Sequence, residues 1–318
     1  MKTNQIMKAS AAFLLALSMT ACSSGSASTT DGTAAAEPKT GVNSTYAYLL
    51  DTTDLAKPEL DLSNADGVLK SILDKGVMTI STSPDYPAAE WITDDGTIYG
   101  SEMMLAKYIA DCLGVDLAIE TMDFNSTLVA VDAGKADVAF SGYGWKADRE
   151  ESYELSKGYI GDPDNDNYHT LIVKKGDEEK YTSLEDFVGA HILAQANSLQ
   201  EMYVTDQIVA LDPNGGTNLE KVATLDQAIL GLASDKCDAV ALDGTTAENY
   251  VKQSDGKFAL TGLKFDLTIY GDFEGNIGIV KKGETSMINA INTIIQTVKD
   301  NGYYEKWYAI AKEAAGVE

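Results

Sequence analysis

Short apolar runs alternate with amphipathic helical patterns along most of the chain, and this alternation constrains the fold more than any other feature. The first series predicts a strand, a helix, a strand, a helix and a strand over 77–81, 101–113, 115–120, 126–133 and 136–140. A second series predicts strands over 191–195 and 239–242 and helices over 199–211, 225–234, 286–300 and 304–314. Strand–helix alternation with short links favours parallel sheets covered by helices, here in two α/β lobes.

Composition excludes several classes of function. The 318 residues include 24 Lys and Arg against 49 Asp and Glu, a net charge of −25, so a nucleic-acid partner or a basic lipid-docking surface is not expected. Three Cys cannot form a disulfide framework, and the two His are too far apart for a zinc motif. Ala139 stands where a G-x-S-x-G nucleophile motif needs its first glycine. We therefore expect the protein to bind no metal and no cofactor and to have no catalytic activity.

The N-terminus has the pattern of a lipoprotein signal. Two lysines precede an apolar run over 9–17, which is too short to span a bilayer and ends in L-S-M-T-A-C. This end resembles the lipobox of bacterial lipoproteins, which implies cleavage after residue 21 and lipidation of Cys22; an ordinary secretory signal is the alternative. Small residues over 23–36 favour a flexible tether, so residues 22–65 are assigned to the lipidated Cys and a linker or N-terminal extension.

An ordered set of motifs resembles one family. The set begins with S-I-L-D-K-G-V-M-T-I-S-T-S-P-D-Y-P near Ser71 and continues with D-D-G-T-I-Y-G-S-E-M-M-L-A-K-Y-I-A-D-C-L-G. It goes on through A-G-K-A-D-V-A-F-S-G-Y-G-W-K-A-D-R and A-S-D-K-C-D-A-V-A-L-D to G-I-V-K-K-G and D-N-G-Y-Y-E-K-W. Together these motifs resemble the bacterial extracellular solute-binding proteins of family 3, the polar-amino-acid receptors of ABC importers.

The resemblance implies a type II periplasmic-binding-protein fold, in which two α/β lobes joined by a two-strand hinge close on a small ligand. Lobe 1 would hold residues 66–161 and 270–318, and lobe 2 residues 166–265. The chain would cross between the lobes near 161–165 and 267–271. Ligands of α/β proteins lie beyond the carboxyl ends of strands, which agrees with a site in the interlobe cleft.

Two charged residues are the main site candidates. Arg149, the chain's only arginine, stands where the family clamps a ligand carboxylate, a task that suits a guanidinium fork; the alternative is a surface ion pair with Glu150 or Glu151. Asp243 follows the apolar run 239–242 and matches the family acid that pairs with the ligand ammonium. Its alternative role is a turn with the following glycine.

Further ligand-binding residues follow from the same resemblance. Tyr86 matches an aromatic lid and Phe124 a second apolar wall, although either could belong to the core. The remaining candidates are Ser141, Ser198, Gly142, Gly144, Ser83 and Gln195. Ser198 is also expected to cap a helix.

The chain departs from the family at several of these positions. Gly142 and Gly144 replace hydroxyl residues, and Lys146 replaces a threonine. Asn197 replaces a glycine and tolerates left-handed geometry. Ser83 stands where relatives that bind cationic amino acids carry Asp, so the ligand's identity stays open.

Two further patterns suggest a calcium loop and a disulfide, and we expect neither to form. The acidic run 162–166 does not fit a calcium loop, because Asn167 and Val173 stand where such a loop needs Gly and Glu. It is interpreted as a solvated hinge loop. Cys112 and Cys237 fall in different lobes, so no disulfide is expected between them.

The leading interpretation is a monomeric receptor, anchored to the bacterial membrane through lipidated Cys22, that captures an amino acid and delivers it to an ABC permease. One alternative is an enzyme that dehydrates cyclic carboxylic acids, with Glu90 or Asp243 as general acid. The other is a sensor whose closed form engages a membrane receptor. The sequence leaves open which solute is bound and whether capture serves transport or sensing.

Overall fold

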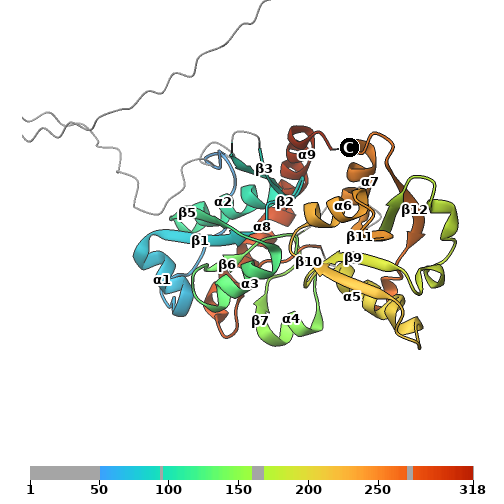
Figure 1. Ribbon diagram of the computed structural model, residues 1–318. Coiled ribbons are helices and arrows are strands. Elements are labelled where there is room, and N and C mark those ends of the chain that lie inside the picture. The colour runs from blue at the N-terminus through green and yellow to red at the C-terminus, as the bar shows by residue number, and fades with distance from the viewer. Residues whose placement is uncertain (1–50, 94–95, 160–167, 271–274, 318) are drawn as a thin grey trace, which may run out of the picture. The chain divides into compact units, whose positions relative to one another are not determined.

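The computed structural model describes residues 51–93, 96–159, 168–270 and 275–317 (Figure 1). The helices are α1 (Gly67–Lys75), α2 (Ser101–Leu113), α3 (Phe124–Asp132), α4 (Ala147–Ser152), α5 (Leu199–Gln207), α6 (Leu225–Ala233), α7 (Gly244–Gln253), α8 (Thr285–Asp300) and α9 (Tyr303–Ala315). Short 3₁₀ helices cover Glu178–Lys180, Leu184–Phe187, Val209–Leu211 and Thr268–Tyr270. The strands are β1 (Val77–Thr82), β2 (Asp85–Tyr86), β3 (Glu90–Ile92), β4 (Ile98–Tyr99), β5 (Asp116–Thr121), β6 (Val138–Ala139), β7 (Tyr153–Leu155), β8 (His169–Lys174), β9 (His191–Gln195), β10 (Asn218–Val222), β11 (Ala239–Asp243), β12 (Phe258–Lys264) and β13 (Ile279–Lys281).

Most of the predicted elements are confirmed within two residues at their ends. Helix α2 ends at the predicted residue, and Gly114 follows it with φ 70°, a left-handed conformation that glycine adopts at little cost. The helix predicted over 199–211 is wrong in its second half. It breaks at Ile208, where φ and ψ leave the helical region, and continues as a 3₁₀ turn.

Two five-stranded sheets define the two lobes. The sheet of lobe 1 has the order β5-β1-β6-β13-β7 and that of lobe 2 the order β10-β9-β11-β8-β12, while β2, β3 and β4 form a separate small sheet. The expectation of parallel sheets is wrong in part. Strand β13 runs antiparallel to β6 and β7, and β8 runs antiparallel to β11 and β12. These strands lie near the expected lobe crossings and do not follow the strand–helix–strand repeat that gives parallel pairs.

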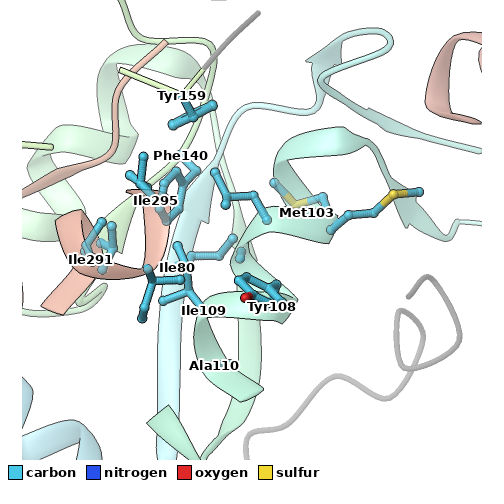
Figure 2. Packing of buried hydrophobic residues seen from close by; sticks show 14 of the residues in the cluster. Ile80, Met103, Tyr108, Ile109, Ala110, Phe140, Tyr159, Ile291 and Ile295 are labelled. Carbon is cyan, nitrogen blue, oxygen red and sulfur yellow. The ribbon is translucent and has the colours of Figure 1, made fainter. Parts of the chain in front are cut away.

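Helices cover both faces of each large sheet. In lobe 1, helices α1, α2, α8 and α9 pack on one face in a core that includes Ile80, Ile109, Phe140 and Ile291 (Figure 2). Helix α3 packs on the opposite face. In lobe 2, α5 covers one face, and α6 and α7 cover the other. Alternate residues of the central strands face opposite cores, so both strand faces must be apolar.

The described part of the expected N-terminal extension is packed against lobe 1. The amide of Ala56 donates a hydrogen bond to the Tyr303 hydroxyl at 2.9 Å, and the hydroxyl of Tyr108 donates to the carbonyl of Ala56. Leucines of the same segment pack against the lobe 1 core. Packing therefore begins before residue 66, the predicted start of lobe 1.

Several expectations concern residues outside the described ranges. They are the signal peptide, the lipidated Cys22, the first crossing at 161–165 and the acidic run 162–166. Of the second crossing, residues 267–270 are described, and Leu267 and Tyr270 pack against the lobe 2 core. On the lobe 1 side, Tyr159 and Asn276 form an antiparallel bridge next to both crossings. Cys112 and Cys237 are both free thiols.

Candidate functional site

Arg149 is a buried cation on the short helix α4. The residue is 4% exposed, so it is not the surface ion pair that the sequence left as an alternative. One terminal nitrogen donates to the carbonyl of Gly144 at 2.7 Å, and the other donates to the carbonyl of Asn197 in lobe 2. No Asp or Glu forms a salt bridge with it among the described residues. Burial lowers the pKa of Arg149, and two neutral carbonyls are its polar partners.

Two aromatic rings flank this guanidinium. Its central carbon lies 5.0 Å from the ring centroid of Tyr143 and 5.8 Å from that of Phe124, which begins α3. The two rings are 4.8 Å apart. Phe124 therefore contributes both to the core under α3 and to the surroundings of Arg149, so the two roles that the sequence left open are compatible. Tyr143 was not predicted.

Asp243 ends β11 and caps α7. Its Oδ1 accepts a hydrogen bond from the amide of Thr246 at 3.0 Å, and the residue is 8% exposed. Burial raises the pKa of Asp243, while hydrogen bonds from Thr246 and from the Tyr86 hydroxyl lower it. Tyr86 belongs to β2 beside lobe 1, so the predicted lid and the predicted ammonium-binding acid meet across the lobes.

Gly142 lies against the ring of Tyr86. A Cβ atom at this position would fall 2.9 Å from two ring carbons, and the backbone has φ 61°. Its amide donates to both carboxylate oxygens of Glu102, at 2.9 and 3.1 Å. Glycine at this departure from the family therefore makes room for Tyr86.

The serine candidates make hydrogen bonds within the protein. Ser141 Oγ accepts from the amide of Ser83 at 2.9 Å and donates to Glu90 at 3.2 Å. Ser198 caps α5 as predicted, with its hydroxyl accepting from the Glu201 amide at 3.1 Å. Asn197 has φ 63°, which confirms the left-handed geometry expected there.

Asp85, which the sequence did not single out, links Ser83 and Gln195. Its Oδ1 accepts from Ser83 Oγ at 3.0 Å, and its Oδ2 accepts from Gln195 Nε2 at 2.9 Å. Oδ2 also accepts from the amide of Leu225, the first residue of α6, at 3.1 Å. In this structure the side chains of Ser83 and Gln195, two predicted ligand-binding residues, thus both donate hydrogen bonds to the carboxylate of Asp85.

Glu90, the general-acid candidate of the enzyme alternative, lies opposite Tyr86 in the small sheet and forms a buried acid pair with Glu102 that the sequence did not predict. Both residues are fully buried. Burial raises the pKa of Glu90 well above its usual value, and the neighbouring Glu102 raises it further. Glu102 also accepts hydrogen bonds from Tyr159 at 2.9 Å and Asn276 at 3.1 Å, the residues that flank the two lobe crossings. The surroundings of Glu90 therefore favour its uncharged form.

Neither a metal cluster nor a membrane span is found in the described residues. No group of three or more His, Cys, Asp and Glu side chains there could hold a metal ion. No helix of that part is long and apolar enough to cross a bilayer. The candidate site thus combines a buried cation flanked by two aromatic rings with a capped acid in the opposite lobe that contacts Tyr86.

The family model for bacterial extracellular solute-binding proteins, family 3, matches residues 78–310. The chain belongs to this family. The arginine-binding extracellular protein ArtP of Bacillus subtilis is 27% identical over 234 residues, which are 73% of this chain and 84% of ArtP. The L-cystine-binding protein TcyJ of Escherichia coli is 22% identical over 76% of this chain and 86% of its own length.

Solved structures give the same result for the fold. The amino acid ABC transporter substrate-binding protein AbpA of Streptococcus pneumoniae, solved with L-arginine, superposes with a TM-score of 0.68 at 28% identity. The match covers 78% of this chain and 99% of AbpA. The predicted two-lobed type II fold is confirmed, and family membership gives a solute-binding protein of extracytoplasmic location rather than an enzyme.

Proposed function

We propose that the protein captures a free amino acid by closing its two lobes around it, with Arg149 binding the carboxylate and Asp243 the ammonium group. In this proposal Cys22 carries the lipid that anchors the protein to the bacterial membrane, and an ABC permease receives the solute. ArtP and TcyJ are named as binding proteins for arginine and L-cystine, and AbpA was solved with bound L-arginine, which supports an amino acid as the ligand.

The buried Arg149 guanidinium is the observation on which the proposal depends. A buried charge is costly unless a partner of opposite charge compensates it, and an arginine keeps its charge in proteins. Carbonyl oxygens satisfy some of its N–H groups, and Asp148 and Glu201 act on it electrostatically, but a directly paired negative charge is not found among the described residues. A ligand carboxylate would supply this charge and two parallel hydrogen bonds.

Asp243 provides the complementary charge from lobe 2. Its carboxylate is oriented by the Thr246 amide and lies next to the Tyr86 hydroxyl. A ligand ammonium would offset the burial that now raises the pKa of Asp243. Because the two charged residues belong to different lobes, one zwitterion satisfies both only in the closed state, and binding therefore favours closure.

Calorimetric titration with the twenty common amino acids and L-cystine tests the proposal. The protein is unfolded and refolded first to remove any bound ligand. We expect binding by a few related amino acids, a loss of about tenfold or more on Arg149→Lys, and weak binding of the N-acetylated ligand. The ligand should be recovered unchanged, whereas its consumption would favour the dehydratase alternative. Unchanged affinity in Arg149→Lys would remove this residue from the site.

The lipid anchor is tested separately through Cys22. Cells fed labelled palmitate should label the full chain and its Cys112→Ser variant, but not the Cys22→Ser variant. Equal labelling of the Cys22→Ser variant would refute lipidation at this residue. Delivery to a permease predicts that loss of the protein abolishes uptake of the bound amino acid, whereas a sensor would leave uptake unchanged.

A further inference from the structure

We propose that Asp85 is a latch that holds lobe 2 against lobe 1 and sets how readily the lobes close, acting as a positioning residue rather than as a ligand contact. Its effect on affinity depends on the proposed function, but its effect on closure does not. The latch joins three groups that are far apart in the sequence: Asp85, the side chain of Gln195 and the first amide of α6.

The first contact satisfies the N-terminus of a helix. The first amides of a helix have no partner within it and carry a partial positive charge, so a carboxylate there is stabilising. Thr224 caps the Gln227 amide from within lobe 2, whereas the Leu225 amide donates to Asp85, which belongs to β2 beside lobe 1. Opening the lobes would separate this carboxylate from the helix.

The second contact fixes Gln195 at the end of β9. The amide nitrogen of Gln195 donates both to Asp85 and, at 3.2 Å, to the carbonyl of Ala223 in the loop before α6. Gln195 thus connects β9 with the start of α6 on the lobe 2 side of the latch. Hydrogen bonds to a charged acceptor are stronger than neutral ones, so the contact favours the closed arrangement.

Lobe 1 holds the carboxylate in position. Ser83 Oγ donates to Asp85 Oδ1, whereas the contacts with lobe 2 are made by Oδ2, and Ser141 Oγ accepts from the Ser83 amide. Tyr86, the next residue after Asp85, contacts Asp243 and Gly142. The latch therefore lies one residue from the aromatic lid, so closure through Asp85 also places Tyr86 over the site.

Small-angle X-ray scattering without ligand measures the latch directly. We expect the radius of gyration to increase in Asp85→Ala, to increase less in Asp85→Asn, and to stay unchanged in Asp226→Asn. The last variant is the matched control, because it removes a negative charge from the neighbouring residue of α6, whose carboxylate accepts from Tyr250 instead. Equal radii in wild type, Asp85→Ala and Asp226→Asn would overturn the proposal.

Exchanging the acid and the amide between positions 85 and 195 distinguishes loss of the latch from a general loss of structure. Gln195→Glu places two carboxylates together and should open the lobes. Combining it with Asp85→Asn places an amide opposite a carboxylate again and should restore the wild-type radius. A double variant as open as Gln195→Glu alone would contradict pairing between these side chains.

Calorimetric titration with L-arginine, the ligand of AbpA, and then with the other amino acids provides the second measurement. We expect about tenfold weaker binding in Asp85→Ala and wild-type affinity in Asp226→Asn. Saturating ligand should return the radius of Asp85→Ala to the wild-type value. If no amino acid binds the wild type, the proposed function fails, while the scattering comparison still decides the latch. Unchanged affinity together with an unchanged radius would exclude it.

Discussion

At the scale of single residues, the fit of Tyr86 against Gly142 gives a steric prediction. The Gly142→Ala variant would bring a Cβ to 2.9 Å from the Tyr86 ring, at a left-handed φ of 61° that alanine adopts at a cost. We expect displacement of Tyr86 and about tenfold weaker amino acid binding by calorimetry.

Gly134→Ala is the matched control for this variant. Gly134 has a similar φ of 67°, but a Cβ there meets nothing within 4 Å. It should lose about 1 kcal/mol of unfolding free energy from backbone strain and keep its affinity. Equal affinity in both variants would show that Tyr86 does not need the space at Gly142.

The Glu90–Glu102 pair gives a prediction about pH. In the unfolded chain Glu90 has its usual pKa of 4.5, and burial raises the pKa well above that value in the folded state. From about pH 4.5 upward the folded state therefore binds more protons than the unfolded state. The contribution of Glu90 lowers the free energy of unfolding as pH rises, by up to about 1.4 kcal/mol per pH unit.

The Glu90→Gln variant removes this titration while keeping a neutral donor of similar shape. Urea unfolding between pH 5 and pH 8 should show a less negative slope of stability against pH in Glu90→Gln than in wild type. Glu313→Gln, at an exposed position of α9, should keep the wild-type slope. Identical slopes in all three proteins would mean that Glu90 is already ionised at pH 5.

At the scale of elements, we expect the N-terminal segment 51–65 to contribute to the stability of the fold but not to ligand binding. It contacts Tyr108 and Tyr303, and its partly buried leucines cover the lobe 1 core. A chain starting at residue 66 should have a free energy of unfolding about 3–6 kcal/mol lower than a chain starting at residue 51, because three partly buried leucines each contribute about 1–2 kcal/mol. Affinity should not change, because these contacts do not include Arg149, Asp243 or Tyr86. Equal stability of the two chains would contradict the packing.

Sequence reasoning predicted helices and strands well where local chemistry determines them. Gly114 ends α2 and Ser198 begins α5 because a left-handed residue and a capping hydroxyl act within a few residues. The direction of β8 and β13 was missed because strand pairing depends on distant parts of the chain. Strands β2 and β4, with two residues each, are too short for any periodicity to show.

The same distinction applies to the candidate site. Arg149, Asp243 and Tyr86 were predicted from a resemblance. In the structure Arg149 contacts Asn197 of lobe 2, and Tyr86, beside lobe 1, contacts Asp243 of lobe 2. Asp85 gave no signal because its partners Gln195 and Leu225 are 110 and 140 residues away. The buried pair of Glu90 and Glu102 was equally hidden, since an acid in a sequence is by default expected on the surface.

At the scale of the whole molecule, the two lobes have separate hydrophobic cores, and the proposed ligand connects them. A ligand that binds the folded state only raises stability by about 2.7 kcal/mol at a hundredfold excess over its dissociation constant. If one ligand bridges Arg149 and Asp243, the loss of either contact removes most of the benefit of closure. The effects of Arg149→Lys and Asp243→Asn should therefore not add.

A double-mutant cycle on ligand affinity measures this coupling. We expect each single variant to weaken binding about tenfold or more, and the double variant to weaken it by clearly less than the product of the two, because interacting sites deviate from additivity by about 0.5–3 kcal/mol. Arg149→Lys combined with Asp226→Asn is the control pair, and its effects should multiply. Multiplicative losses for Arg149 and Asp243 would mean that each lobe holds its part of the ligand independently, so that binding does not depend on closure.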